Sequence, residues 1–176
     1  MTGRPASSEH VPYHGKYIAL VPGEDVLAAF ENQSAATRTF LASISSDKSL
    51  HRYDPAKWSV REAWVHVLDC ERVFVYRALR LARGDTAALE GFEPDRWGPP
   101  SGADARSWRS ILLEYEDVRR ATIAFFRNLP EDAWLRTGKV GGNFVSVRAL
   151  AWIAVGHDIH HRTVIRDLYL GAGPTV

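Results

Sequence analysis

The sequence predicts an all-α protein, a four-helix bundle with one long connection. First, apolar residues recur at helical spacing in four long segments, at residues 23–45, 59–83, 103–128 and 147–170. Second, residues 85–102 are rich in glycine and proline and exceed the usual connection of about 2–8 residues between bundle helices. Third, 176 residues of which 45% are hydrophobic suit one domain of ordinary size. We therefore expect a single domain over residues 1–176, with its core at 23–170.

The composition argues against several classes of protein. No uncharged apolar run approaches the roughly 18 residues needed to cross a bilayer, and the first residues lack the apolar stretch of a signal peptide. The formal net charge is +1, with basic residues spread along the chain, which argues against a dedicated nucleic-acid surface. A single cysteine, Cys70, excludes an internal disulfide and a multi-cysteine zinc module. We expect a cytoplasmic protein without membrane or nucleic-acid partners.

The amino-terminal part is expected to be irregular. Residues 1–22 contain three prolines and show little periodicity, so we expect an arm that holds at most a short extended piece at Tyr17–Val21. The second helix has the strongest start signal, because Ser59 and Glu62 have the spacing of a capping box. Gly84 suits the carboxyl end of that helix. Its middle is apolar on most sides, so this helix should be the most enclosed element.

The second half of the chain continues the bundle. The segment at 85–102 is expected to be a crossover or a lid. The third helix ends before Pro130, and the glycine-containing segment 137–144 predicts a tight turn or a small hairpin. Ser146 is the expected N-cap of the last helix, which the run Gly171-Ala172-Gly173-Pro174 closes.

The last helix carries two histidines on its inward face. Positions taken at a 3-4-3-4 spacing form a regular apolar line whose two central members are histidines: Val147, Leu150, Ala154, His157, His161, Val164 and Leu168. Residues at i and i+4 lie about 40° apart on a helix, so His157 and His161 project together. This is how a helix offers two nitrogen ligands to one metal ion. His160 would be a competing partner for His157, but it lies off this line.

A third histidine completes a candidate metal site. His66 lies about two turns into the enclosed second helix and is flanked by large apolar residues. Three histidines from two facing helices would leave coordination positions open, which is typical of a catalytic site. The alternative is that all three are hydrogen-bonded core imidazoles. His10 and His14 in the arm, and His51 in a linker, are expected to be surface residues.

Three further residues near the candidate site have two readings each. Cys70 follows His66 by one helical turn and is either a sulfur ligand or a small core residue. Glu71 either supports a ligand or forms a structural ion pair with an arginine such as Arg72, Arg77 or Arg162. Arg162, next to His161, either anchors an anionic substrate or lies on a solvated helix face.

Segments of two predicted helices resemble the DinB-like superfamily. The first group lies in the second helix and the second group in the last helix: Trp58–Glu62, His66–Phe74 and Tyr76–Arg80, then Ser146–Leu150 and Gly156–Arg162. The resemblance covers about residues 53–170. It implies a four-helix bundle with up-up-down-down connectivity, often a homodimer. It also implies a divalent ion, zinc or nickel, held by three histidines that fall on His66, His157 and His161.

The resemblance also implies a class of reaction. Characterised members include thiol-dependent S-transferases that use bacillithiol and a mycothiol-dependent isomerase. We therefore expect a metal-dependent enzyme in which the ion lowers the pKa of a low-molecular-weight thiol or a water, which attacks a small-molecule substrate. The reaction would be thiol transfer or hydrolysis. The alternative is a non-catalytic metal- or ligand-binding stress-response protein on the same bundle.

Overall fold

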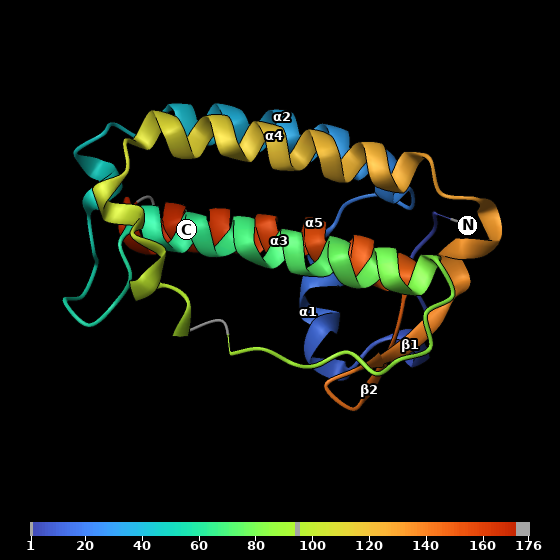
Figure 1. Cartoon of the computed structure of the whole chain (residues 1–176). Helices are drawn as coiled ribbons and strands as arrows, with labels where there is room; N and C mark the ends of the chain where they lie inside the picture. Colours follow the sequence, from blue (N-terminus) through green and yellow to red (C-terminus); the bar gives the residue numbers. More distant parts are fainter. Residues whose placement is uncertain (1, 94–95, 172–176) are drawn as a thin grey trace.

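Four long helices form the body of the protein in a computed structural model that describes residues 2–93 and 96–171 (Figure 1). They are α2 (Val26–Ala42), α3 (Val60–Ala82), α4 (Trp108–Arg127) and α5 (Val147–Val164). The predicted all-α four-helix bundle is confirmed. Two of the predicted caps are present: the Ser59 hydroxyl accepts from the Glu62 amide at 3.0 Å, and the Ser146 hydroxyl accepts from the Ala149 amide at 3.0 Å. These side chains satisfy amide groups that the first turn of each helix leaves unpaired.

The helix directions differ from the connectivity that the resemblance implies. At one end of α2 and α4, Arg127 pairs with Glu31, and at the other the Trp108 indole donates to the Leu41 carbonyl at 3.2 Å, so these helices are antiparallel. Helices α3 and α4 are parallel, and α5 runs against both (Figure 1). The order is therefore up-down-down-up and not up-up-down-down.

Two connections explain this order: the one between α2 and α3, and the one between α4 and α5. Each is held by hydrogen bonds at a single end of the bundle. Between α2 and α3, the Arg61 guanidinium donates to the Ser49 hydroxyl at 2.8 Å. Between α4 and α5, the Val147 amide donates to the Arg136 carbonyl at 3.0 Å, and the Arg136 guanidinium donates to the Ala82 carbonyl at 2.5 Å. A connection held at one end makes the helices that it joins antiparallel. The segment at 85–102 is the predicted crossover, since it links the parallel pair.

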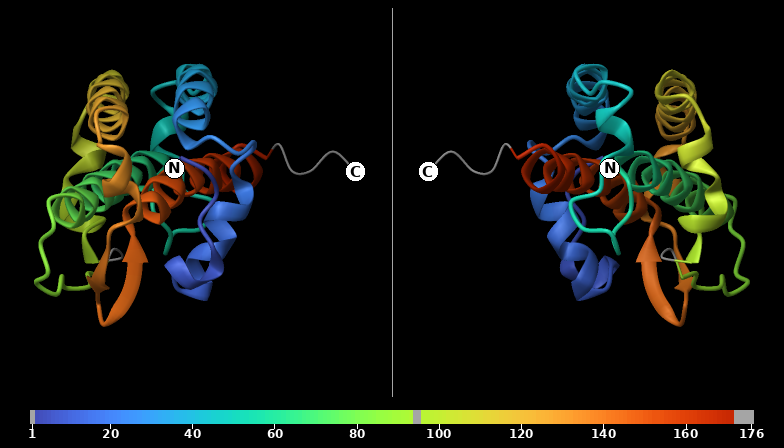
Figure 2. Two further views of the ribbon diagram at one scale, coloured as in Figure 1. Left: turned by 90° about the vertical axis from the view of Figure 1, so that its right-hand side faces the viewer. Right: turned by 90° about the vertical axis from the view of Figure 1, so that its left-hand side faces the viewer.

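The elements lie in three layers. In the end views, α2 and α4 form one layer, α3 and α5 the next, and a short helix α1 (Pro12–Leu20) with a hairpin lies beneath α3 and α5 (Figure 2). The predicted hairpin is confirmed: β1 (Thr137–Val140) pairs antiparallel with β2 (Asn143–Ser146). Gly141 and Gly142 have positive φ angles in its turn, a conformation that glycine adopts without strain.

The expectation of an irregular arm with an extended piece at Tyr17–Val21 is wrong, because residues 12–20 are helical. Pro12 is the first residue of α1, a position where proline is favoured because its missing amide would be unpaired anyway. The arm before it is anchored to α5, since Glu9 accepts from the Ser146 hydroxyl at 2.7 Å and pairs with Arg148. These contacts lower the pKa of Glu9 to about 2, chiefly through the hydrogen bond from Arg148.

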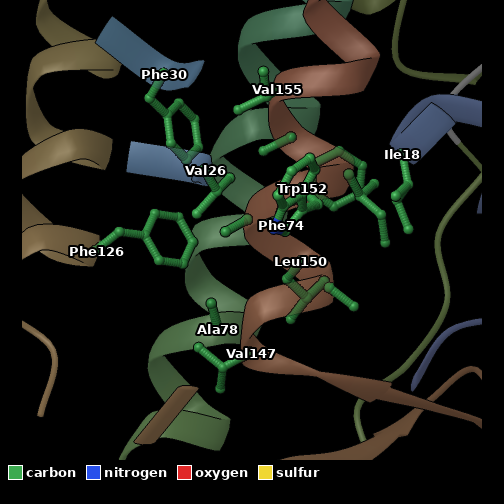
Figure 3. Packing of buried hydrophobic residues seen from close by; sticks show 14 of the residues in the cluster. Ile18, Val26, Phe30, Phe74, Ala78, Phe126, Val147, Leu150, Trp152 and Val155 are labelled. Carbon is green, nitrogen blue, oxygen red and sulfur yellow. The ribbon is translucent and has the colours of Figure 1, made fainter. Parts of the chain in front are cut away.

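Two clusters of buried apolar residues join the first two layers. Figure 3 shows Phe30 of α2 and Phe126 of α4 pointing toward the side chains of α3 and α5. Their rings stack with centroids 5.6 Å apart, and both side chains are fully buried. Trp152 of α5 is also fully buried and donates to the Thr2 carbonyl at 3.1 Å. The arm thus covers the outer side of α5.

The last helix ends in a wider turn. Residues Ile165–Tyr169 form a π-helical turn after α5, closed by a bond from the Leu170 amide to the Ile165 carbonyl at 3.1 Å. This change of pitch turns Leu168, predicted to face inward, to 53% exposure. Gly171 has a positive φ, as expected of a closing glycine, and residues 172–174 lie outside the described residues. None of the helices described is long and apolar enough to cross a membrane.

Gly156 lets α1 approach α5 closely. A Cβ atom at this position would lie 2.1 Å from the Tyr17 carbonyl oxygen and 2.4 Å from the carbonyl carbon. Neither atom is the end of a flexible side chain, so an alanine there must push α1 away from α5.

We expect Gly156→Ala to destabilise the protein by about 1–3 kcal/mol, the usual cost of overpacking, and to loosen α1. Urea unfolding measures the first effect, and limited proteolysis within residues 10–22 measures the second. The matched control is Gly15→Ala within α1, where the new Cβ would lie at an ordinary 3.6 Å from the His10 ring. Equal stability and proteolysis of the two variants would contradict the assigned packing.

Candidate metal centre

Three histidines from α3 and α5 converge on the face that α1 covers. The Nε2 atoms of His157 and His161 lie 3.1 Å apart. One nitrogen from each of His66, His157 and His161 lies within 4.8 Å of the other two. The ring centroid of His66 is 5.1 Å from that of His157 and 4.9 Å from that of His161. The structure therefore brings His66 together with His157 and His161, the pair predicted from the spacing.

The donor set fits a divalent metal ion. Bonds from zinc to imidazole nitrogen are about 2.0–2.1 Å long, so two nitrogens on a tetrahedral ion lie roughly 3.3 Å apart. The 3.1 Å between His157 and His161 matches that spacing. His66 approaches from the opposite helix and closes the third side. Three neutral imidazoles suit zinc and nickel alike, so the geometry leaves the choice of metal open.

The protonation state also suits ligands. Burial lowers the pKa of His157 well below its ordinary value, and the neighbouring imidazoles His161 and His66 lower it further. Burial likewise lowers the pKa of His161. Both rings are therefore neutral at pH 7, which is the form that binds a metal.

Aromatic side chains fix the histidine rings. The Tyr17 ring meets the His157 ring edge to face, with centroids 5.3 Å apart, and the Phe74 ring does the same at 5.7 Å. The Trp58 ring lies 5.0 Å from that of His66. His160, the competing partner considered for His157, instead packs its ring against Tyr17 at 5.4 Å. It is not part of the described group of converging nitrogens.

Cys70 touches the site without joining the ligand group. Its Sγ atom is 3.7 Å from both ring nitrogens of His66. Burial raises the pKa of the Cys70 thiol to about 12, so it stays protonated at neutral pH. The side chain is 3% exposed. These observations favour the reading of Cys70 as a small buried residue that packs against His66.

A cavity of about 580 Å³ lies over the three histidines. Its walls come from α1, the linker before α3, the hairpin and the connection after α3. Gly91 and Phe92 line it, as expected if the segment at 85–102 covers the site. The volume falls within the range of roughly 300–1,000 Å³ that is usual for small-molecule sites.

Two lining residues correct the sequence analysis. His14, expected at the surface, lines the cavity, and its buried Nδ1 has no hydrogen-bond partner among the described residues. Arg77 of α3 also lines it and was not singled out as a site residue. A helix predicted to begin at Pro12 would have placed His14 on a regular element that can pack against the bundle, and not in an irregular arm. His51 is exposed, as expected.

Arg162 points away from the cavity. Its guanidinium donates to the Thr37 hydroxyl at 3.0 Å and to the Gln33 side chain at 2.6 Å, so it joins α5 to α2. It is absent from the described residues that line the cavity. The candidate role of Arg162 as a substrate anchor is therefore replaced by a structural one, because its guanidinium is bound to side chains of α2.

Glu71 forms a structural ion pair, as expected, but its partner is Arg119 of α4 and not Arg72, Arg77 or Arg162. The Arg119 guanidinium donates to Glu71 at 2.7 Å and to Asp158 at 2.7 Å. Asp158 also accepts from the Thr37 hydroxyl at 2.7 Å and the Tyr115 hydroxyl at 3.2 Å. The sequence analysis missed Arg119 and Asp158. Their partners lie 39 to 121 residues away in the chain, so no local spacing reveals them.

Comparisons with known proteins agree with this fold. The family model of the DinB superfamily matches residues 29–165. The chain is similar to YfiT from Bacillus subtilis, described as a probable metal-dependent hydrolase with an unusual four-helix bundle topology: the identity is 18%, the TM-score 0.72, and the match covers 96% of this chain and 93% of YfiT.

It is also similar to the DinB-like protein YjoA from Bacillus subtilis, with 19% identity and a TM-score of 0.60, over 85% of this chain and 92% of YjoA. No protein of curated function matches the chain. At these identities, the two structural similarities show a shared fold.

Proposed function

The chain belongs to the DinB superfamily, and from this premise we propose that it is a metal-dependent enzyme acting on a small molecule. His66, His157 and His161 would hold one divalent ion, zinc or nickel. The observation that carries the proposal is the convergence of three imidazole nitrogens at the wall of a cavity of about 580 Å³. Three protein ligands leave a position open to substrate, which is typical of catalytic rather than structural zinc sites.

The ion would supply Lewis acidity, which makes a water molecule or a thiol nucleophilic at neutral pH. The side chains around it would orient the ligands and limit the access of water. Tyr17 and Phe74 each meet the His157 ring edge to face, and Trp58 packs against His66. Phe92 of the crossover also lines the cavity.

Two reactions follow from this arrangement. Hydrolysis is supported by the similarity to YfiT. Transfer of a low-molecular-weight thiol is implied by the family resemblance and stays a prediction, as does the homodimer. The alternative of a non-catalytic metal-binding protein predicts a closed ligand shell. Cys70 lies outside the described ligand group, and this favours the enzyme.

We expect turnover that depends on the metal and on the three histidines. Protein loaded with zinc or nickel would be assayed against a panel of activated esters, and with cysteine or glutathione against 1-chloro-2,4-dinitrobenzene. Loss of even an outer contact to a metal ligand costs about 10–100-fold in activity, so His161→Ala should lose at least about 100-fold. His51→Ala, in the exposed linker, should keep wild-type activity. Equal activity of His161→Ala and wild type, or no metal-dependent turnover in either assay, would refute the proposal.

A further inference from the structure

Arg77 is a buried cation that pairs with no acidic side chain among the residues described. The residue is 8% exposed and lines the cavity over the histidines. One terminal nitrogen of its guanidinium donates to the Glu90 carbonyl at 2.9 Å, and the group lies 5.1 Å from the centre of the Phe92 ring. Among the described residues, no carboxylate pairs with it. Buried charges in proteins are normally paired, so an unpaired one needs a reason.

The charged side chains described in the cavity lining are all positive, like Arg77. The described lining residues include two cations, Arg77 and Lys16, and neither aspartate nor glutamate. The Lys16 ammonium lies over the rings of Tyr13 and Tyr17, at 3.9 and 4.8 Å from their centres. A cation–π contact holds an ammonium group in place while leaving its charge uncompensated.

His14 adds an unsatisfied polar atom on the same side. Its ring lines the cavity together with Arg77, and its Nδ1 is buried without a hydrogen-bond partner in the described part of the chain. Burial lowers the pKa of His14 to about 4, and the nearby charges of His10, Arg77 and Lys16 act in the same direction. The ring is therefore neutral at pH 7 and can donate or accept one hydrogen bond.

We propose that the enzyme acts on a small substrate that carries a carboxylate or a comparable anionic group, and that Arg77 binds this group, with Lys16 and His14 beside it. The inference rests on the proposed function, because it defines the substrate of the same cavity. Along α3, Arg77 follows His66 by 11 residues, which is about 16 Å of helix rise. Side chains of a helix lean toward its amino terminus, so the Arg77 guanidinium leans back toward His66. The anionic group is thus held at a distance from the three histidines, and the rest of the substrate lies between them.

The test compares probes that differ only in charge. Wild-type protein is titrated with 3-phenylpropionate, its neutral amide 3-phenylpropionamide, and the cation 3-phenylpropylamine, following the tryptophan fluorescence, to which Trp58 in the cavity wall contributes. Each titration is run on zinc-loaded and on chelator-treated protein. We expect the carboxylate to bind at least about 10-fold more tightly than the amide in both forms, as for a charge-assisted bidentate contact. The amine should bind most weakly.

Substitutions locate the contact. Arg77→Gln should weaken carboxylate binding at least about 10-fold and leave amide binding unchanged, and Lys16→Gln should show a smaller loss. The matched control is Arg80→Gln on the same helix, where the guanidinium pairs with Asp85 and lies outside the described lining of the cavity; its binding should equal wild type. If Arg77→Gln does not fold, Arg77→Lys takes its place, because lysine keeps the positive charge at this position. In either case, the order in which wild-type protein binds the three probes tests the inference.

Two results would overturn the inference. One is equal binding of the carboxylate and the amide by the wild type. The other is a preference for the carboxylate that is lost on chelation and unchanged in Arg77→Gln, because the ion would then be the binding group. Failure of the proposed function looks different: charge selectivity through Arg77 would persist in a protein that shows no metal-dependent turnover.

Discussion

His161→Ala is expected to bind zinc at least about 100-fold more weakly than the wild type, which should bind one equivalent per chain. Removing an outer contact to a metal ligand already costs about 10–100-fold in affinity, and this substitution removes a ligand itself. The two Nε2 atoms 3.1 Å apart on α5 are the closest pair of donors described at the site. Elemental analysis and competition with a fluorescent chelator measure stoichiometry and affinity.

Zinc should also stabilise the wild type against unfolding. A ligand that binds only the folded state adds about 2.7 kcal/mol at 100 times its dissociation constant. His161→Ala should show little of this increase. Because burial holds the pKa values of His157 and His161 well below their ordinary range, protons compete little with the metal at pH 7. The same neutral rings make the metal-free protein less stable as the pH falls below about 6.5. Below that pH, the histidines of the unfolded chain take up protons that the buried rings of the folded protein do not.

The matched control for the metal centre is His160→Ala. His160 directly precedes His161 on α5 and packs against Tyr17, but its nitrogens are not part of the described group. It should keep one equivalent of zinc. Equal metal loss in His160→Ala and His161→Ala would contradict the assignment, and so would full zinc binding by His161→Ala.

Features that arise from contacts within one or two helical turns could be predicted from the sequence, and features that arise from contacts between distant segments could not. The pairing of His157 with His161 follows from helix geometry alone, and Ser59 and Ser146 mark helix starts through contacts within one turn. These features were predicted correctly. The helix α1 was missed because it is short and begins at Pro12, and its place depends on the close approach to Gly156 of α5. Short helices gain most of their stability from such packing.

Two other features depend on contacts between distant segments. The helix directions are set by Arg61 and Arg136, whose bonds hold the connections at the ends of the bundle. The lack of an acidic partner for Arg77 within residues 2–93 and 96–171 becomes apparent once the crossover and α1 are in place around it. Nothing in the spacing of these residues along the chain indicates either result.

Arg119→Met is expected to destabilise the fold by about 3–5 kcal/mol, the usual cost of breaking a buried ion pair from one side. The Arg119 side chain is 2% exposed, between Glu71 at 2% and Asp158 at 0%. Without the guanidinium, two carboxylates would face each other in the core. Burial already raises the pKa of Asp158, so one of them would have to take up a proton in order to fold.

This explanation gives a pH dependence with a definite sign. Protonation of Asp158 relieves the repulsion, so the stability gap between Arg119→Met and wild type should shrink as the pH is lowered from 8 to 5. Adding Glu71→Gln and Asp158→Asn to Arg119→Met should recover part of the loss at pH 8 for the same reason. Urea unfolding at the two pH values measures both effects. Arg120→Met, at the next position, removes an exposed pair with Asp117 and should change stability by less than about 1 kcal/mol.

The size of the expected loss reflects where the network lies. Thr37 of α2, Glu71 of α3, Arg119 of α4 and Asp158 of α5 are joined by hydrogen bonds of 2.7 Å, so one cluster connects all four long helices. Asp158 directly follows His157, and Glu71 directly follows Cys70, which touches His66. The cluster therefore fixes α3 and α5 at the level of the three histidines. If Arg119→Met instead lost less than about 1 kcal/mol, or no more than Arg120→Met, this cluster could not be what holds the two halves of the metal centre in register.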